Sequence, residues 1–523
     1  MASYNRHSID SRPSRFADRL GAEIVARKSA AVRKAGGLYL TPVAVADFIA
    51  HQASTGTSEI RILDPAAGSG TLLCSVVERL LMPESAVRRV ELTTYETDPD
   101  LQEALAAVLE NLKRWAAEHQ VEVAVRIEKK DFVLAHAGNL GSNGHLFDTQ
   151  SNEPFDLAVA NPPYFKISKD DPRAQAAMVV VHGQPNIYAL FMAATAALLR
   201  KGGEFLFITP RSFASGPYFR LFREKFFANV RPVGVHVFGS RREAFGRDEV
   251  LQESMILRGI RDDGWQHSAE RFELEISGSA GVADLSNATR RTLPLSDALT
   301  MASGDKVFRL PILPCEDAAL RVVDSWTGSL HKYEMNISTG PVVPFRATEF
   351  LDKFVTPSED YAPLIWMNHV LAMQVTFPIE TRKPQYIRVS ASEKSLLLPN
   401  RNYVLLRRFS AKEEARRLVA APWLKSTFPG SLLGIENHLN YIYSMRGEMS
   451  EDETLGLAAL LNTELLDTYF RVSSGNTQVS ATELRAMPLP PRDVIVSIGQ
   501  RVKRQTGGES LDEIVRDAIG APR

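Results

Sequence analysis

The tetrapeptide Asn161-Pro162-Pro163-Tyr164 has the residue types needed to activate a planar amine, and it directly follows the apolar run 155–160. Two prolines fix the backbone and remove two amide donors, so carbonyl oxygens stay free to face a ligand. The Asn161 side-chain oxygen and the Pro162 carbonyl can each accept one amine hydrogen, which draws the nitrogen toward tetrahedral geometry and frees its lone pair. Tyr164 can stack on the ring that carries the amine. The tetrapeptide predicts group transfer to an amine, with a proline-rich turn as the alternative.

A glycine-rich turn follows a different predicted strand, 60–63. The sequence Asp64-Pro-Ala-Ala-Gly-Ser-Gly70 leads from this strand into a helical pattern, and Gly68 and Gly70 permit a tight turn close to a ligand. Dinucleotide and phosphate sites use similar turns, so the turn alone leaves the ligand open. No lysine follows the glycines, as a phosphate-binding P-loop requires.

Two further carboxylates follow the next two predicted strands. Glu96 ends the segment 90–96 and can accept hydrogen bonds from both ribose hydroxyls. Asp131 comes after the segment 121–127 and can accept from an adenine amino group, while Phe132 offers a flat apolar wall. Each carboxylate alone is readily explained as a helix cap. Asp64, Glu96 and Asp131 in register indicate a pocket for an adenosine that carries no phosphates.

The elements that position these residues alternate between short apolar strands and helical patterns. Strands are predicted at 60–63, 90–96, 121–127, 155–160 and 205–209. Thr41 is predicted to cap a helix that starts with Pro42, and Asp98 to cap the helix after Glu96. Such alternation is typical of a mostly parallel, doubly wound α/β sheet of Rossmann type, which binds ligands at the carboxyl ends of its strands.

The alternation fades after about residue 260, which sets the predicted domain boundaries. Residues 1–260 form the predicted α/β domain, and the polar stretch 261–305 is predicted to be a linker or a peripheral extension. Residues 306–523 lack the strand–helix rhythm and are expected to form a mixed α+β domain. Its window 381–425 carries eleven basic and three acidic side chains, a net charge of +8 on a chain whose formal charge is −1. That window favours phosphate contacts, although a solvated charged face is the alternative.

Composition excludes several classes of protein. Of the 523 residues, 44% are hydrophobic and 24% are charged, which is an ordinary balance for a globular protein. No apolar run approaches the roughly 20 residues needed to cross a bilayer, and the N-terminus lacks the apolar core of a secretion signal. Cys74 and Cys315 stand far apart, so neither a disulfide framework nor a cysteine-based metal site is expected, and a reducing cytoplasm fits.

The order of these motifs resembles the gamma-class N6-adenine DNA methyltransferases of the TaqI type. The resemblance covers Thr41-Pro42, the glycine turn, Tyr95-Glu96, Asp131-Phe132 and the Asn161 tetrapeptide, roughly the first half of the chain. It implies a class I methyltransferase sheet and S-adenosylmethionine as methyl donor. Thr41, Asp64 and Ala66 would lie near the methionine moiety and Glu96 at the ribose. Thr97, Asp131 and Phe132 would hold the adenine.

The same resemblance implies double-stranded DNA as substrate, with the target adenine flipped out of the duplex. Phe245 would close over the base opposite Tyr164, with Phe213 and Phe238 as rival candidates. Lys166, just after the tetrapeptide, would lie near DNA. The second half would be a target-recognition domain; its candidate DNA contacts are Arg382, Lys383, Arg407, Arg408, Asn437, His438, Asn476 and Gln478. A cognate restriction endonuclease is an expected partner, and the protein is expected to be a monomer or a dimer.

Four other functions stay open at this point. Protein glutamine or RNA can present a similar planar amine or amide, although a second half this large favours DNA. Cytosine N4 is a further possible acceptor, although serine in place of Asn161 would be more usual there. A DNA-binding specificity protein with a decayed methyltransferase fold would lack cofactor binding. A fused endonuclease is suggested only by the segment Glu380–Lys383, whose single match is weak.

Overall fold

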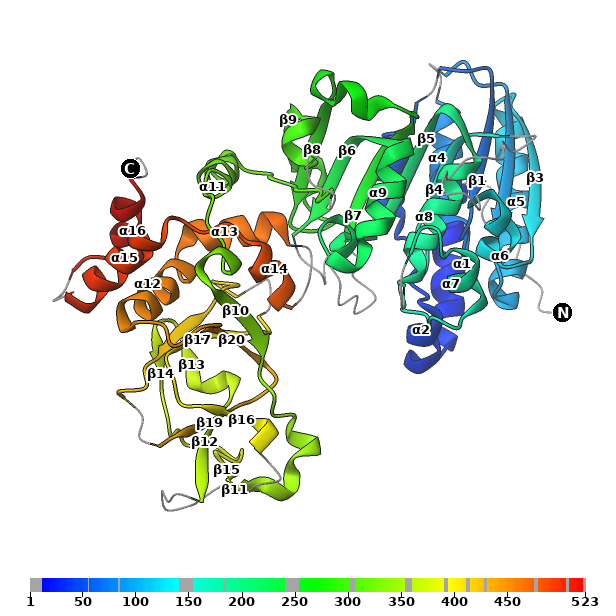
Figure 1. The fold of residues 1–523 in the computed structure, drawn as a ribbon. Helices are drawn as coiled ribbons and strands as arrows, with labels where there is room; N and C mark the ends of the chain where they lie inside the picture. Colours follow the sequence, from blue (N-terminus) through cyan, green and yellow to red (C-terminus); the bar gives the residue numbers. More distant parts are fainter. Residues whose placement is uncertain are drawn as a thin grey trace. The chain divides into compact units, whose positions relative to one another are not determined.

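The computed structural model describes residues 12–54, 56–82, 85–140, 154–181, 185–239, 254–300, 306–352, 360–389, 394–410, 414–427, 430–474, 478–504 and 508–520. The chain divides into two compact units, Met1–Ile312 and Leu313–Arg523 (Figure 1). No helix within the described ranges is long and apolar enough to span a bilayer.

The first unit is built on one sheet, to which its described residues contribute nine strands in the order β3-β2-β1-β4-β5-β7-β6-β8-β9. The strands are β1 Glu59–Asp64, β2 Arg89–Tyr95, β3 Glu122–Glu128, β4 Phe155–Ala160, β5 Leu199–Pro210, β6 Val230–Phe238, β7 Ser254–Arg261, β8 Glu273–Ser279 and β9 Thr289–Pro294. The five neighbouring strands β3, β2, β1, β4 and β5 pair in parallel. Strand β7 lies between β5 and β6 and runs antiparallel to both. The predicted mostly parallel sheet is confirmed.

Helices cover both faces of this sheet because its central strands are apolar on both sides. In β4, Leu157 and Val159 belong to one buried cluster, while Ala158 and Ala160 belong to the other. The first cluster includes residues of α1 Pro13–Arg27, α3 Val43–Ala50, α4 Thr71–Leu80 and α5 Pro99–Glu118. The second includes residues of α6 Phe132–His136, α7 Pro172–Ala176, α8 Ile187–Leu198, α9 Arg220–Asn229 and α10 Leu295–Ala298. The doubly wound arrangement is therefore confirmed.

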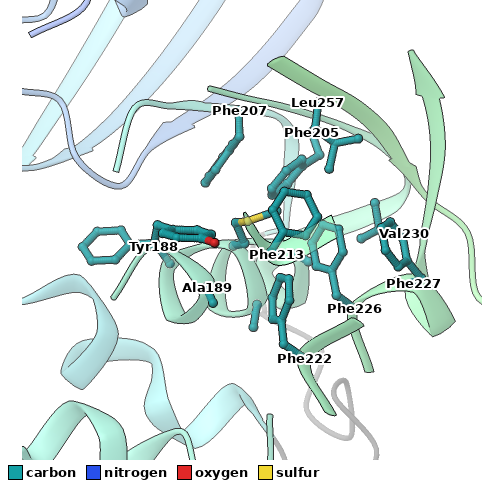
Figure 2. Close-up of a cluster of buried hydrophobic side chains, with 14 of the residues drawn as sticks. Tyr188, Ala189, Phe205, Phe207, Phe213, Phe222, Phe226, Phe227, Val230 and Leu257 are labelled. Carbon is teal, nitrogen blue, oxygen red and sulfur yellow. The ribbon is translucent and has the colours of Figure 1, made fainter. Parts of the chain in front are cut away.

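Phenylalanine rings fill the second of these clusters beneath β5 (Figure 2). Phe205 and Phe207 of β5 stack with ring centroids 4.0 Å apart, and Phe205 meets Phe226 of α9 edge-on at 5.3 Å. Phe213, in the 3-10 turn Arg211–Ala214, is fully buried among them. This packing holds β5 and the turn Arg211–Ala214 against α9.

The segment 261–305, for which composition left a linker or a peripheral extension open, belongs to the sheet of the first unit in its described part, 261–300. It contributes β8 and β9, which extend the sheet beyond β6, and the turn Trp265–Arg271 with its buried Trp265. In β9 only Leu293 is buried, and in β8 exposed and buried residues alternate from Glu273 to Ile276. Edge strands exposed on one face need few apolar residues, so their composition is close to that of a loop.

The second unit is a mixed α+β domain, as predicted. Its described strands form sheets in the orders β10-β20-β17-β18, β11-β15-β12-β19-β16 and β13-β14. The strands are β10 Met335–Thr339, β11 Leu351–Asp352, β12 Tyr361–Ile365, β13 Val370–Leu371, β14 Gln374–Val375, β15 Tyr386–Arg388, β16 Leu397–Pro399, β17 Tyr403–Arg407, β18 Ala420–Trp423, β19 Leu432–Ile435 and β20 Leu439–Ser444. Its helices are α11 Pro314–Asp324, α12 Glu451–Leu461, α13 Glu464–Ser473, α14 Ala481–Ala486, α15 Arg492–Arg504 and α16 Leu511–Ile519, and they share a core with β10, β17 and β20.

Candidate active site

A cavity of about 360 Å³ lies beside the residues that follow β1 to β4. The sequence-predicted residues that line it are Ala66, Gly68, Glu96, Thr97, Asp131, Phe132 and Asn161. A smaller hollow is lined by Thr41, Asp64, Ala66, Gly68 and Asn161. Ala66, Gly68 and Asn161 line both spaces. The fold therefore brings the glycine turn, the strand-end carboxylates and the tetrapeptide to one place.

Backbone conformation explains the glycines of the turn. Gly68 and Gly70 have φ values of +56° and +87°, which side-chain-bearing residues rarely adopt. A Cβ atom at Gly68 would lie 2.8 Å from Leu40, and one at Gly70 would lie 2.9 Å from Leu105 on α5. Gly70 is also the N-cap residue of α4. At these two positions the turn can stay this close to its neighbours only because the residues have no side chains.

Glu96 is held in place by the backbone. Its carboxylate accepts hydrogen bonds from the amides of Gly68 at 2.9 Å, Thr97 at 2.7 Å and Asp98 at 2.8 Å. Burial raises the pKa of Glu96, and these three donors oppose that effect. A carboxylate oxygen can accept more than one hydrogen bond, so both oxygens keep capacity for the two hydroxyls of a ribose.

Asp64 is a buried acid with a single backbone donor. It accepts a hydrogen bond from the Ala66 amide at 3.0 Å and is 1% exposed. Burial raises the pKa of Asp64 to about 7, and the nearby charge of Glu96 adds to this effect. Because a buried carboxylate is costly without a cation, the smaller hollow suits a positively charged group, such as the ammonium of a methionine moiety.

Phe132 and Asp131 form the far wall of the cavity. The Phe132 ring stacks on Phe191 of α8 at 5.4 Å and meets Tyr95 edge-on at 5.0 Å. Asp131 accepts from the Leu134 amide at 2.9 Å and lies 3.6 Å from Arg173 of α7. Asp131 therefore caps α6, which was the plainer alternative for it, and it also faces the cavity.

The side chain of Asn161 has a defined orientation. Its Nδ2 donates to the Tyr39 carbonyl at 2.8 Å and to Thr41 Oγ1 at 3.1 Å. The one hydrogen of the Tyr164 hydroxyl has two acceptors within reach, Asn161 Oδ1 and the Ile208 carbonyl, the latter at 2.9 Å. Thr41 is not the N-cap of α3, as its position suggested; Pro42 is.

Tyr164 does not present its ring to the cavity, although the sequence suggested a stacking surface. The ring is 8% exposed, lies 6.4 Å from the Tyr39 ring at an angle of 21°, and meets Tyr188 edge-on at 6.2 Å. It lines neither space, whereas Tyr39 lines both. Stacking of Tyr164 on a base would require the rings to move.

The second aromatic residue of the site stays unassigned. Phe245 lies outside the described residues. Its rivals Phe213 and Phe238 are 0% and 1% exposed and belong to the two buried clusters of the sheet, so neither faces a substrate. Their places before or after strands reflect packing alone.

Among the cavity residues that sequence reasoning missed are Tyr39, Arg173 and Lys28. Tyr39 stands two residues before Thr41, which the resemblance placed at the cofactor, so a signal was present. Arg173 lies in α7, which follows the tetrapeptide. Lys28, at the end of α1, pairs with Asp98 at 2.8 Å and Asp100 at 2.7 Å. No pattern in the sequence distinguishes Lys28, because its place depends on how α1 packs.

Backbone hydrogen bonds join the residues just after the tetrapeptide to those at the start of α8. Ile187 donates to the Phe165 carbonyl and Ile167 to the Pro185 carbonyl, both at 2.9 Å, and Lys166 forms an isolated bridge with Asn186. Lys166 itself is exposed. Its ammonium group is therefore available for a phosphate contact.

Four predicted DNA contacts meet on one surface of the second unit, which we call the β17–β20 surface: Arg408, Asn437, His438 and Gln478. Arg408 donates to the Asn437 carbonyl at 3.1 Å and to Gln478 Oε1 at 3.2 Å. His438 and Gln478 are exposed, and His438 pairs with the buried Glu436. Asn476 lies outside the described residues.

The basic window offers less free charge than its composition suggested. Arg388 lies 3.7 Å from Asp352, Arg416 lies 3.2 Å from Asp512, and Arg417 is 2% exposed. Arg407 donates to the Val370 carbonyl at 2.7 Å. Arg382 and Lys383 are exposed, and the Lys383 ammonium sits 4.5 Å from the Trp366 ring centroid. Many cations of this window therefore stabilise the fold.

Comparison with known proteins assigns the chain to a family. The Eco57I restriction-modification methylase model matches residues 79–245. The type II methyltransferase M.BsuBI of Bacillus subtilis is 31% identical over 467 residues, covering 89% of this chain and 90% of that relative. M.PstI of Providencia stuartii is 31% identical over 490 residues, covering 92% of both. The solved type IIG restriction endonuclease BpuSI is 14% identical, with a TM-score of 0.45 over 97% of this chain and 68% of that one.

The similarity to these two relatives runs along nearly all of both chains and so extends into both units. The chain therefore belongs to the type II methyltransferases of restriction–modification systems, as a site-specific DNA methyltransferase that uses S-adenosylmethionine.

Proposed function

We propose that the protein methylates the N6 amino group of an adenine flipped out of double-stranded DNA, and that this protects DNA from a cognate restriction endonuclease. The proposal rests mainly on one observation. Asn161 lines both the large cavity and the smaller hollow, with its amide oriented by fixed neighbours.

The residues of the cavity fit S-adenosylmethionine. Glu96 would bind the ribose hydroxyls, while Asp131 and Phe132 would hold the adenine, with Thr97 alongside. Ala66, Gly68 and Gly70 let the backbone approach, and Asp64 would accept the ammonium of the methionine. The bound cofactor supplies an electrophilic methyl group on a sulfonium. Buried carboxylates suit this cation, whereas a nucleotide phosphate would be repelled by them.

The chain's own contribution to the reaction is a pair of acceptors. Asn161 Oδ1 and the Pro162 carbonyl would each take one hydrogen of the amino group, so the nitrogen lone pair leaves the ring system. Positive charge grows on that nitrogen during transfer, so fixed oxygen dipoles stabilise the transition state more than the ground state. No base is needed beforehand, because the proton leaves only after the nitrogen has become cationic.

DNA contact is divided between two kinds of residue. Arg408, Asn437, His438 and Gln478 on the β17–β20 surface carry groups that can read base edges. The exposed Lys166, Arg382 and Lys383 would contact phosphates, which fixes position without reading sequence. Arg407 would act indirectly, because its Nε is already bound to a backbone carbonyl.

Transfer of a labelled methyl group to matched duplex DNA, RNA and protein substrates tests this function. We expect label in duplex DNA, and loss of it in Asn161→Ala. The variant should still bind S-adenosylmethionine, which calorimetry would check, because Asn161 is not a proposed cofactor contact. Label found only in RNA or protein would refute the substrate assignment.

A further inference from the structure

The hydroxyl of Thr41 bonds to a residue of the reacting end rather than to the helix that follows it. The N-cap of α3 is Pro42, and no side chain caps this helix. Thr41 is 6% exposed, and its Oγ1 lies 3.1 Å from Asn161 Nδ2. A buried hydroxyl in this place sits beside the cofactor hollow but is engaged with the tetrapeptide.

The neighbours of Asn161 settle which way its amide faces. A carbonyl oxygen can only accept, so the amide edge next to the Tyr39 carbonyl must be the NH2 group. Turning the amide over would set two oxygens against each other at that contact. Tyr39 and Thr41 together provide one acceptor for each hydrogen of Nδ2. The opposite edge, Oδ1, is left as the acceptor for another donor.

Tyr164 shows how that acceptor can be released. Its hydroxyl has one hydrogen but two acceptors in reach, Asn161 Oδ1 and the Ile208 carbonyl. Burial raises the pKa of Tyr164, so the hydroxyl stays protonated. The hydrogen can rest on Ile208 when a substrate amine approaches, and an amide oxygen can also accept two hydrogen bonds.

Close packing links the same two segments. Gly37 has a φ of +59°, and a Cβ atom there would lie 2.9 Å from the Tyr164 backbone nitrogen and 3.2 Å from Pro163 Cβ. Residues 37–41 therefore pack directly against the tetrapeptide. Movement of one segment must displace the other.

We propose that Thr41 is a positioning residue for methyl transfer: together with the Tyr39 carbonyl, its hydroxyl holds the Asn161 amide so that Oδ1 faces the substrate amine. This inference rests on the proposed function and revises the expected role of Thr41 as a contact of the methionine moiety. Because Thr41 acts through Asn161, loss of its hydroxyl should lower the rate of methyl transfer.

The test compares Thr41→Val, which removes the hydroxyl at nearly constant shape, with Thr41→Ser, which keeps it. Single-turnover methylation of duplex DNA is measured at saturating S-adenosylmethionine, and cofactor affinity is measured separately by calorimetry. Loss of one buried hydrogen bond predicts a rate about tenfold lower in Thr41→Val, with cofactor affinity unchanged. Thr41→Ser should restore the wild-type rate. Thr41→Ala removes the same hydroxyl with a smaller side chain, so it replaces Thr41→Val as the test variant if valine does not fit, with the same tenfold loss expected.

Two results would overturn the inference. A normal saturated rate with weakened cofactor binding would make Thr41 a cofactor contact. Equal losses in Thr41→Val and Thr41→Ser would make its role one of packing. Failure of the proposed function is distinct, because the wild-type protein itself would then leave duplex DNA unmethylated.

Discussion

Replacement of Asp64 by asparagine should uncouple cofactor binding from pH. Asp64 is 1% exposed, has the Ala66 amide as its hydrogen-bond donor and has a pKa of about 7. Below that pH the carboxyl group is largely neutral. If the ionised form receives the cationic end of S-adenosylmethionine, protons compete with the cofactor. A pKa of 7 then makes binding about tenfold weaker at pH 6 than at pH 8.

The same shift predicts a change in stability with the opposite sign. The folded-state pKa of Asp64 lies above its unfolded value of 3.8, so its contribution to stability is full below pH 3.8 and is lost as pH rises through 7. From pH 6 to pH 8 the cofactor-free protein should lose about 1.4 kcal/mol from this residue. Asp64→Asn should lack that loss.

Calorimetry of S-adenosylmethionine binding at pH 6, 7 and 8, with thermal melting of the cofactor-free protein, measures both effects. We expect wild-type affinity to rise across this range, while Asp64→Asn binds weakly at every pH. Wild-type affinity that does not change with pH would show that Asp64 is not the group receiving the cation.

Other substitutions separate the roles of individual residues. Gly37→Ala should cost about 1–2 kcal/mol of stability from its left-handed backbone and slow methylation at saturating cofactor, since its Cβ would displace the tetrapeptide; an unchanged rate would contradict the coupling of segments 37–41 and 161–164. Arg408→Ala should weaken binding to the cognate duplex by about 1–3 kcal/mol and relax specificity, as competition binding would measure. Lys383→Ala should weaken cognate and unrelated duplexes alike and lower the salt dependence of log Kd by about one unit; the opposite pattern for these two variants would reverse their assignments.

The sequence predicted the parts of the site that depend on local rules. Glycines in a strand-to-helix turn and acids at strand ends are recognisable because parallel strands deliver their carboxyl ends to one edge. Gly68, Glu96 and Asp131 therefore meet at one cavity as expected. The cap at Asp98 is likewise local, and the structure shows it accepting from Asp100 and Leu101.

Features that depend on tertiary packing could not be predicted in this way. The strand β9 lies at the sheet edge with β8 beside it, and polar residues are tolerated there, so composition left both a linker and a peripheral extension open. Thr41 stands before a proline and a helix, yet its hydroxyl accepts a hydrogen bond from Asn161, which lies 120 residues later in the sequence. The ring of Tyr164 is buried by Tyr39 and Tyr188, which no spacing in the tetrapeptide reveals.

Charge in the second unit shows the same limit. Composition shows the net charge of the window 381–425, but the partners of Arg388 and Arg416 are acids outside that window, Asp352 and Asp512. Only the folded arrangement separates cations that neutralise such acids from cations that face solvent, as Arg382 and Lys383 do.

Nucleoside analysis of DNA from expressing cells decides whether the adenine amino group is the methyl acceptor. Duplex DNA from cells that express the protein would be digested and compared with DNA from cells that express Asn161→Ala. We expect N6-methyldeoxyadenosine in the first sample and its absence from the second. N4-methylcytosine in place of methyladenine, or equal methylation with the variant, would contradict the role given to the Asn161 amide.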